Sequence, residues 1–93
     1  MMAEQLAKMT EQEFFQQLGE ELRQLRLERR WNQGQLAKRT GIHRNSITRY
    51  ERGADLTVSS LVIVCAALGT SAAVVLDQVF ANGVKIEKEK SSR

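Results

Sequence analysis

Apolar residues recur at helical spacing soon after the start of the chain, which predicts a long amphipathic helix. The stripe expected to be buried consists of Phe14 or Phe15, Leu18, Leu22 and Leu25. Intervals of three or four residues place such a stripe on one face of an α-helix. Thr10 followed by Glu13 has the pattern of a capping box, in which each side chain bonds the other residue's backbone N–H. We therefore expect this helix to begin near Glu11 and to end near residues 29–30.

Two short helices joined by a tight turn are predicted within residues 33–52. Their inward-facing residues are Leu36, Ala37, Ile47 and Tyr50. Asn32 is a suitable N-cap for the first of them, and Gly41 can adopt φ > 0 and reverse the chain between the two. The second helix is expected to begin at His43 or directly after it and to run to about Arg52.

The outward face of the second short helix carries polar, long and mostly cationic side chains. They are His43, Arg44, Asn45, Thr48 and Arg49. Two crossed helices with one donor-rich face are typical of a helix-turn-helix that reads DNA. Arg can pair with guanine and Asn with adenine through two hydrogen bonds, and each such pair discriminates by ~1–3 kcal/mol. His43 is the single histidine, and with no further ligand at metal-binding spacing we expect no metal site.

Trp31 and Gly34 lie at the start of the first short helix, and each allows two interpretations. Trp31 is interpreted as a core plug between the long helix and the short one, in preference to a base-stacking residue, because it precedes a helix cap. Gly34 is unfavourable inside a helix by about 1 kcal/mol relative to Ala. It either lets a phosphate approach the helix N-terminus or is tolerated at an exposed position, and both interpretations stay open.

A fourth helix, residues 58–68 with Thr57 as its N-cap, is apolar on all sides. The stripe expected to face the core is Leu61, Val64, Cys65 and Leu68. The residues left on its other faces are Val58, Val62, Ile63 and Ala66. A helix that is apolar all round is usually buried all round, so in a domain this small a second subunit is the available cover.

A fifth helix, residues 72–80 with Ser71 as its N-cap, is apolar on most sides as well. Leu76 and Phe80 are sufficient to close the core of one subunit, which leaves other valines in surplus. We therefore predict a twofold homodimer, the commonest closed assembly, through the fourth and fifth helices and the tail. The interface residues expected are Val62, Ile63, Ala66, Val75 and Val79.

The end of the chain carries a turn signal at Asn82 and Gly83, which predicts the end of the fifth helix. The alternation of apolar and charged residues after it, Val-Lys-Ile-Glu-Lys-Glu-Lys, weakly predicts a strand. The chain is accordingly divided into an N-terminal arm or short helix (1–10), a helix-turn-helix DNA-binding and dimerisation domain (11–81) and a C-terminal tail (82–93).

The composition changes this picture little. A chain of 93 residues without proline is expected to form one small all-α domain. The single Cys65 cannot form an internal disulfide and is interpreted as a buried core residue in a reducing cytosol. No apolar stretch is long enough to span a bilayer, and residues 1–10 lack a signal-peptide core. We expect a cytoplasmic protein with no membrane partner.

Catalytic constellations are not found in the sequence. It has no carboxylate pair in an apolar setting, no nucleophile beside a base and no phosphate-cradling glycine loop. We therefore expect neither an enzyme nor a bound cofactor.

Positive charge is concentrated in one part of the chain, although the net charge is only +3. Residues 23–52 hold nine Lys or Arg and two Glu, whereas residues 1–22 hold one Lys and five Glu. Residues 53–84 hold no cation and two Asp. The cations coincide with the predicted helix-turn-helix, which is the electrostatic footprint expected of a phosphate-binding face.

A family pattern is present over residues 18–76. The positions that carry it are Leu18, Gly19, Leu22, Arg23, Leu25, Arg26, Gln33, Leu36, Ala37, Gly41, Ile42, Ile47, Glu51, Gly53, Leu61, Leu68 and Gly69. In these positions the chain resembles the Cro/repressor-like, or XRE-like, helix-turn-helix family. The resemblance implies a compact five-helix bundle of the lambda-repressor-like kind, with the two short helices as the DNA reader.

The resemblance also implies roles for individual residues. Those expected to face or flank the DNA bases are His43, Arg44, Asn45, Thr48 and Arg49. Those expected to contact the DNA backbone are Asn32, Gln33, Gln35, Lys38 and Arg52. Gln33 would also brace the recognition helix, and Arg26 and Glu51 would form a partly buried ion pair that fixes the first helix to the third.

Several positions depart from the family pattern. Trp31 stands where Leu is usual, Gly34 where a helix former is usual, and Leu56 where Pro is common. Val62 and Ile63 are apolar where polar residues are usual, which strengthens the prediction of a dimer.

These patterns predict a sequence-specific regulator of transcription that binds double-stranded DNA as a homodimer on a near-palindromic operator. A repressor, or a controller of restriction-modification or phage type, is the first expectation. The expected partners are double-stranded DNA, a second copy of the chain (with a tetramer on DNA as a further candidate) and RNA polymerase. The alternatives are an antitoxin-type regulator and a protein-interaction module that keeps the fold without reading DNA. The cationic Arg44, Arg49 and Arg52 argue against the second alternative.

Overall fold

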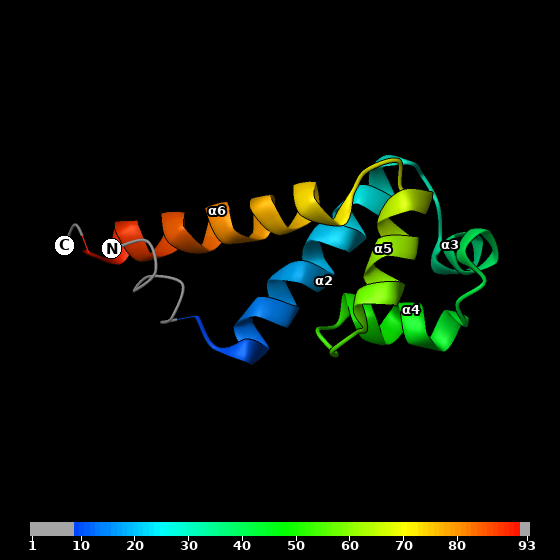
Figure 1. Ribbon diagram of the computed structural model, residues 1–93, viewed down its shortest axis with the longest axis horizontal. Helices are drawn as coiled ribbons and strands as arrows, with labels where there is room; N and C mark the ends of the chain where they lie inside the picture. The colour runs from blue at the N-terminus through cyan, green and yellow to red at the C-terminus, as the bar shows by residue number, and fades with distance from the viewer. Residues whose placement is uncertain (1–8, 92–93) are drawn as a thin grey trace.

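The computed structural model describes the backbone of residues 9–91 and the side chains of residues 9–81, and all regular structure in this part of the chain is α-helical. The helices are α2 (Glu11–Glu28), α3 (Gln33–Thr40), α4 (Arg44–Glu51), α5 (Val58–Ala67) and α6 (Ala72–Ser91). Figure 1 shows α3, α4 and α5 gathered at one end of the molecule, whereas α6 starts against α2 and extends away from this group. The all-α architecture of five helices expected from the sequence is confirmed for the residues described.

The helix N-caps predicted from the sequence are formed. Thr10 Oγ1 accepts from the backbone N–H of Glu13 at 3.0 Å, and Glu13 Oε1 accepts from that of Thr10 at 2.9 Å. Asn32 and Gln35 form the same reciprocal pair at the start of α3, with both distances 2.8 Å. Each pair satisfies two N–H groups near the start of a helix that would otherwise lack a partner. The hydroxyls that cap α5 and α6 are those of Thr57 and Ser71.

The buried apolar residues of the helices form a single core. They are Leu18, Leu22, Leu36, Ile47, Leu61, Val64, Cys65, Leu68, Val75 and Val79. Each buried aliphatic side chain of this kind contributes ~1.5–3 kcal/mol relative to exposure. The stripe predicted for the fourth helix is fully contained in this core, so that prediction is confirmed. One leucine of α3 and one isoleucine of α4 enter the same core and hold the helix-turn-helix against α2 and α5.

The interface assignment of Val75 and Val79 is wrong, because both side chains lie inside the core and are only 1% exposed. Leu76, expected in the core, is half-buried, and Phe80 is 37% exposed with its ring stacked on Phe14 at a centroid distance of 5.7 Å. The physical reason is that α6 is apolar on most sides. Its sequence pattern therefore does not select a buried face, and packing against α2 and α5 decides it.

The predicted end of the fifth helix at Asn82 and Gly83 is also wrong, because the backbone of α6 continues to Ser91. The expected strand in the tail is accordingly replaced by helix. Gly costs about 1 kcal/mol in a helix relative to Ala but does not block the hydrogen-bond ladder as proline does. The Lys and Glu residues that follow are favourable helix formers. The arm predicted for residues 1–10 lies almost wholly outside the described residues.

The helices described include two that are apolar on most sides, α5 and the first half of α6. None of them alone is long and apolar enough to cross a bilayer, although Val58–Ala67 and Ala72–Ala81 reach the required length and composition as a pair that is bent by 99°.

Candidate nucleic-acid interface

The turn between α3 and α4 sets the crossing of the two helices. Gly41 adopts φ 75°, the left-handed conformation predicted for it, and its N–H donates to Ala37 O at 2.8 Å. The hydroxyl of Thr40 accepts from Ile42 N at 3.1 Å and so ties down the residue after the glycine. A residue with a Cβ would be strained at this φ. The tight turn expected at Gly41 is therefore confirmed, and the reason for a glycine there is its positive φ.

His43 is the N-cap of α4. Its Nδ1 accepts from the backbone N–H of Asn45 at 3.1 Å. An accepting Nδ1 belongs to the neutral tautomer that carries its proton on Nε2, which leaves one ring donor for a ligand. The side chain is exposed, so the residue predicted as a flanking contact also holds the start of the recognition helix.

A buried ion pair fixes α4 to α2. Arg26 Nε donates to Glu51 Oε2 at 2.7 Å and Arg26 Nη2 to Glu51 Oε1 at 2.9 Å. The two side chains are only 8% and 4% exposed. The third nitrogen of the Arg26 guanidinium, Nη1, donates to Trp31 O at 2.7 Å. Each of its three nitrogens therefore has a hydrogen-bond acceptor within the protein. The pair implied by the family resemblance is confirmed, and its geometry is the bidentate one that makes such pairs strong.

Gln33 extends this ion pair to the recognition helix. Its Nε2 donates to Glu51 Oε1 at 3.1 Å, and its Oε1 accepts from the hydroxyl of Thr48 at 2.6 Å. The bracing role expected of Gln33 is therefore confirmed. The Thr48 hydroxyl also lies 3.1 Å from Arg44 O, so its single proton has two acceptors within the fold and is not left for a DNA base. α2, α3 and α4 are thus joined by one continuous polar network.

The exposed side of α4 carries Arg44, Asn45 and Arg49. All three are exposed, and within the described part of the chain their side chains make no hydrogen bond or ion pair. The polar groups predicted to meet base edges are therefore free to do so. The buried network holds the backbone beneath them, so their starting points on the helix are well defined.

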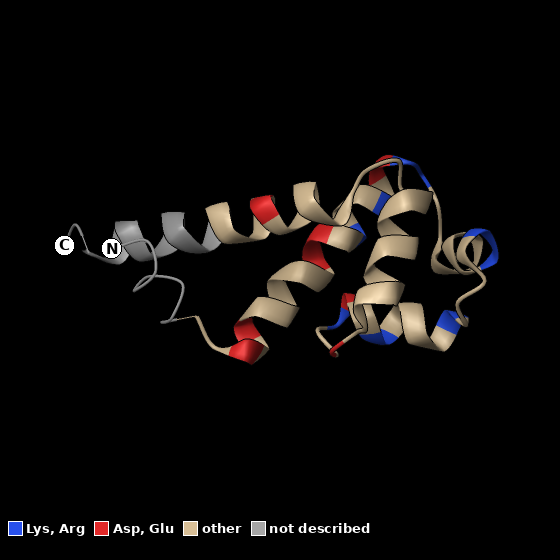
Figure 2. Ribbon diagram, in the orientation of Figure 1, with Lys and Arg blue, Asp and Glu red and all other residues tan. Residues whose placement is uncertain are grey.

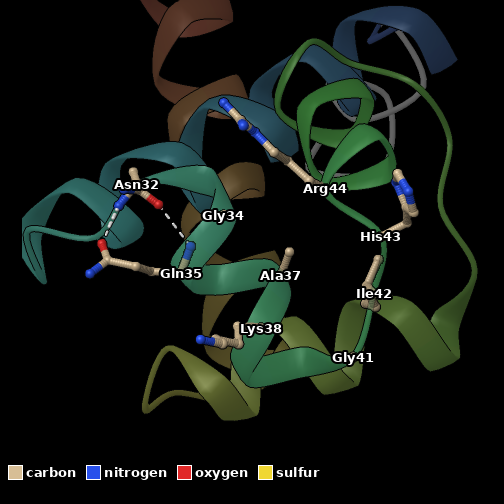
Figure 3. Close-up of a pocket in the computed structure, with 9 residues that line it drawn as sticks. All are labelled: Asn32, Gly34, Gln35, Ala37, Lys38, Gly41, Ile42, His43 and Arg44. Atoms are coloured by element: carbon tan, nitrogen blue, oxygen red, sulfur yellow. Dashed lines mark hydrogen bonds between the residues drawn. The ribbon is translucent and has the colours of Figure 1, made fainter.

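A shallow groove of about 640 Å³ lies between the start of α3 and the start of α4. Its lining residues are Asn32, Gly34, Gln35, Ala37, Lys38, Gly41, Ile42, His43 and Arg44. Figure 3 shows Lys38 on α3 and Arg44 at the start of α4 with their side chains well apart, while Asn32 and Gln35 are joined by their cap bonds. A groove with one cation at either side can accept a phosphate.

The structure gives a reason for glycine at position 34 that differs from both interpretations of the sequence. A Cβ at this position would lie 3.3 Å from Asn32 Oδ1, the atom that accepts from Gln35 N. Such a contact is tight, so the glycine relieves crowding at the cap of α3. It also lines the groove, which leaves the close approach of a phosphate possible.

Of the five residues expected to contact the DNA backbone, Gln33 has its side-chain amide in the polar network, and the other four fall into two groups. Lys38 and Arg52 are exposed cations. Asn32 and Gln35 are engaged in the cap of α3 through their oxygens, and their amide nitrogens stay available as donors. Figure 2 shows Lys and Arg over α3, α4 and the turn after α2, whereas Asp and Glu lie mainly on α2 and α6. The charge asymmetry of the sequence thus becomes a basic end of the molecule.

Trp31 packs against the hydrophobic core and is half-buried, as predicted. Two guanidinium groups also lie over its ring, a contact that was not predicted from the sequence. The Cζ atom of Arg39 lies 4.3 Å from the ring centroid and that of Arg29 lies 5.2 Å from it. These distances are within the range of cation–π attraction.

Gly19 has a packing role that was not predicted from the sequence, where it was noted only as one position of the family pattern. A Cβ there would overlap the carbonyl oxygen of Tyr50 and lie 2.9 Å from that of Glu51. The glycine therefore lets α2 approach the C-terminal end of α4. The signal available in the sequence was a glycine inside a strongly periodic helix, which usually marks close packing.

Cys65 is fully buried, as predicted, and burial raises the pKa of its thiol to about 11. Within the described residues no group of His, Cys, Asp and Glu has the arrangement of a metal site. The polar chemistry that the fold does assemble is that of the donor-rich surface of α3 and α4.

The helix-turn-helix domain family matches residues 17–77. This segment contains α3, α4 and α5 and most of α2, and it includes the polar network and the groove. No curated protein matches the sequence.

Proposed function

This chain belongs to the helix-turn-helix domain family of DNA-binding regulators, and on that premise we propose that it regulates transcription by binding a specific double-stranded DNA sequence as a homodimer. In a helix-turn-helix the second helix enters the major groove, where base edges carry a readable pattern of donors and acceptors. In this chain that helix is α4.

One observation carries the proposal of sequence-specific reading. The polar network runs from the buried pair of Arg26 and Glu51 through the half-buried Gln33 to α4, and the outward side chains of that helix are free. Specific recognition needs such an arrangement, because a bidentate contact from Arg44 or Arg49 gains selectivity only when its helix is held in place.

The proposal of a homodimer is supported by the outer face of α5. Val58, Val62 and Ile63 are 77%, 50% and 41% exposed, and Ala66 lies on the same side of the helix. Residues 53–84 contain no cation that could keep this face in water. A twofold pair formed through α5 would present two copies of α4, for which a near-palindromic operator is expected.

We infer repression as the first outcome, because a dimer bound at a promoter excludes RNA polymerase without further chemistry. Activation would instead require contact with the polymerase. The proposal places the protein in the cytoplasm, where it meets DNA and where its single buried thiol stays reduced, and it includes no enzymatic activity.

The test is selection of bound sequences from a random pool of double-stranded DNA. Enrichment of one motif in two inverted halves, about one helical turn apart, is the expected result. Enrichment of a single half-site would support sequence-specific DNA binding but contradict the proposal of a dimer. Recovery of no motif, with binding that vanishes at moderate salt, would contradict sequence-specific reading altogether.

A further inference from the structure

A second group of cations lies at the turn between α2 and α3, apart from the residues that line the groove. Arg29 and Arg30 form this turn, Arg39 comes from α3, and all three are exposed. The guanidinium groups of Arg29 and Arg39 lie over the ring of Trp31, as described above. Trp31 therefore brings Arg29 and Arg39 together, and Arg30, which lies between Arg29 and Trp31 in the chain, completes the cluster.

The arginines of this cluster differ in whether their side chains bond to other parts of the protein. Arg29 Nε donates to Leu68 O at 3.0 Å, and its guanidinium lies against Gly69, so this residue links α2 to the end of α5. The side chains of Arg30 and Arg39 have no hydrogen bond or ion pair with any residue that the structure describes. No acidic residue stands between Glu28 and Glu51 in the sequence, so their charge is not neutralised by near neighbours in the chain.

The backbone of Arg30 is a second, independent observation. Its φ is 60°, and it is the one residue other than glycine with a positive φ among those described. It follows the C-cap of α2, a position at which helices commonly carry glycine because a Cβ is unfavourable there. A cation near the helix C-terminus offsets part of this cost. A strained residue that is exposed and has no partner in the fold points to a role for its side chain outside the fold.

We propose that Arg30 and Arg39, beside Trp31, bind phosphates of the DNA backbone that flanks the sequence read by α4. The inference rests on the proposed function and extends the DNA contact beyond the two helices of the reader. Figure 2 shows the basic turn after α2 at the same end of the molecule as the cations of α3. The turn also leads directly into Asn32, the first residue that lines the groove. A duplex carries a charge every ~1.7 Å along its axis, so DNA that continues past the operator brings phosphates to this cluster.

The test compares Arg30→Gly and Arg39→Gln with the native protein on the duplex recovered by selection, extended by one helical turn on each side. Binding is measured by fluorescence anisotropy over a series of salt concentrations. Because a bound dimer loses one phosphate contact in each protomer, each variant is expected to bind about 60-fold more weakly at 0.1 M salt, with a slope of log affinity against log salt that is shallower by about two. On a duplex that ends at the operator, the variants and the native protein are expected to bind equally.

The stability of Arg30→Gly separates a DNA contact from a structural role. Glycine relaxes the positive φ, so the melting temperature is expected to stay the same or to rise while affinity falls. A melting temperature that falls together with affinity would make Arg30 a structural residue and overturn its assignment.

Arg23→Gln is the matched control, because it removes the same charge from an exposed site on α2 beside Glu20, 3.5 Å away. It is expected to keep the native affinity and salt slope. If the native protein selects no sequence, the proposed function fails, and the flanking contact fails with it. If the native protein binds its operator but Arg30→Gly and Arg39→Gln keep the native affinity and slope, only the flanking contact is wrong.

Discussion

The polar residues of α4 differ in how much of their bonding capacity the fold already uses. Nδ1 of His43 accepts the hydrogen bond that caps the helix, and the hydroxyl of Thr48 donates to Gln33. Arg44 and Arg49 keep all their side-chain donors, because neither makes a bond inside the described structure. The bonding capacity that stays free on α4 is therefore concentrated in Arg44 and Arg49.

Replacing Arg44 or Arg49 with Ala is expected to remove ~1–3 kcal/mol of preference for the operator over other sequences, because a bidentate base contact is lost. Non-specific binding should persist, since most of it comes from phosphate contacts. Competition binding with operator and scrambled duplexes measures the ratio. The Thr48→Val variant is a useful comparison, and it should lose less preference than either arginine variant. An unchanged ratio in both arginine variants would show that they do not read bases.

The buried thiol of Cys65 gives a prediction for alkaline pH. Its pKa is raised from an ordinary value of 9.0 to about 11 by burial. Between these values the unfolded chain has lost the thiol proton while the folded chain keeps it, so the free energy of unfolding decreases as pH rises, by at most about 1.4 kcal/mol per pH unit. Urea unfolding at pH 8, 9 and 10 measures this decrease. The Cys65→Ala variant, in which the same other groups titrate, should show a flatter dependence, and an identical one would rule out the thiol as the cause.

At the scale of helices, the crossing of α2, α3 and α4 depends on one carboxylate. Glu51 accepts two bonds from Arg26 and one from Gln33, and Gln33 in turn accepts from Thr48. The carboxylate thus orients the helix on which the DNA contacts are proposed. Gly19 permits this closeness, because any Cβ there would collide with the carbonyl groups at the end of α4.

Replacing Glu51 with Ala is expected to lower the free energy of unfolding by about 3–5 kcal/mol, because Arg26 is then left buried and unpaired. The double variant Arg26→Met, Glu51→Leu removes both charges and should regain most of that loss. Urea denaturation followed by circular dichroism measures both values. The double variant should still bind DNA more weakly, since Gln33 has lost its anchor. If the single and double variants are equally stable, the unpaired charge is not the cause of the loss.

On the scale of the whole molecule, two surfaces of different character occur on different helices. The basic surface belongs to α3, α4 and the turn before them, and the uncharged apolar face belongs to α5. Pairing through α5 would therefore leave the proposed DNA-binding surface uncovered in both copies. The core position of Val75 and Val79 narrows this proposed interface to the outer residues of α5.

Replacing Ile63 with Glu is expected to yield a folded monomer, because a charge placed in an apolar interface opposes association. Sedimentation at micromolar concentration measures the mass, and circular dichroism checks that the helices remain. Val75→Glu is the contrasting variant, and it should lose cooperative unfolding, because its charge would be buried in the core. A dimer that persists in Ile63→Glu would place the interface elsewhere.

Much of the fold and of the site could be predicted because the forces concerned act within a few residues. The capping box at Thr10, the N-cap at Asn32 and the left-handed turn at Gly41 depend on contacts between residues at most four apart. The free polar face of α4 follows from helical periodicity alone. The pair between Arg26 and Glu51, 25 residues apart, was expected only because the chain resembles a known family.

What the sequence by itself determined is therefore the local structure: where most of the helices begin and end, and which polar side chains α4 presents. The tertiary structure alone decided that α6 buries Val75 and Val79, that Gly19 lets α2 meet α4, and that Arg39 lies over Trp31. A helix that is apolar on most sides gives no periodic signal for its buried face. Contacts between residues distant in sequence depend on how whole helices pack, and neighbours along the chain do not encode that packing.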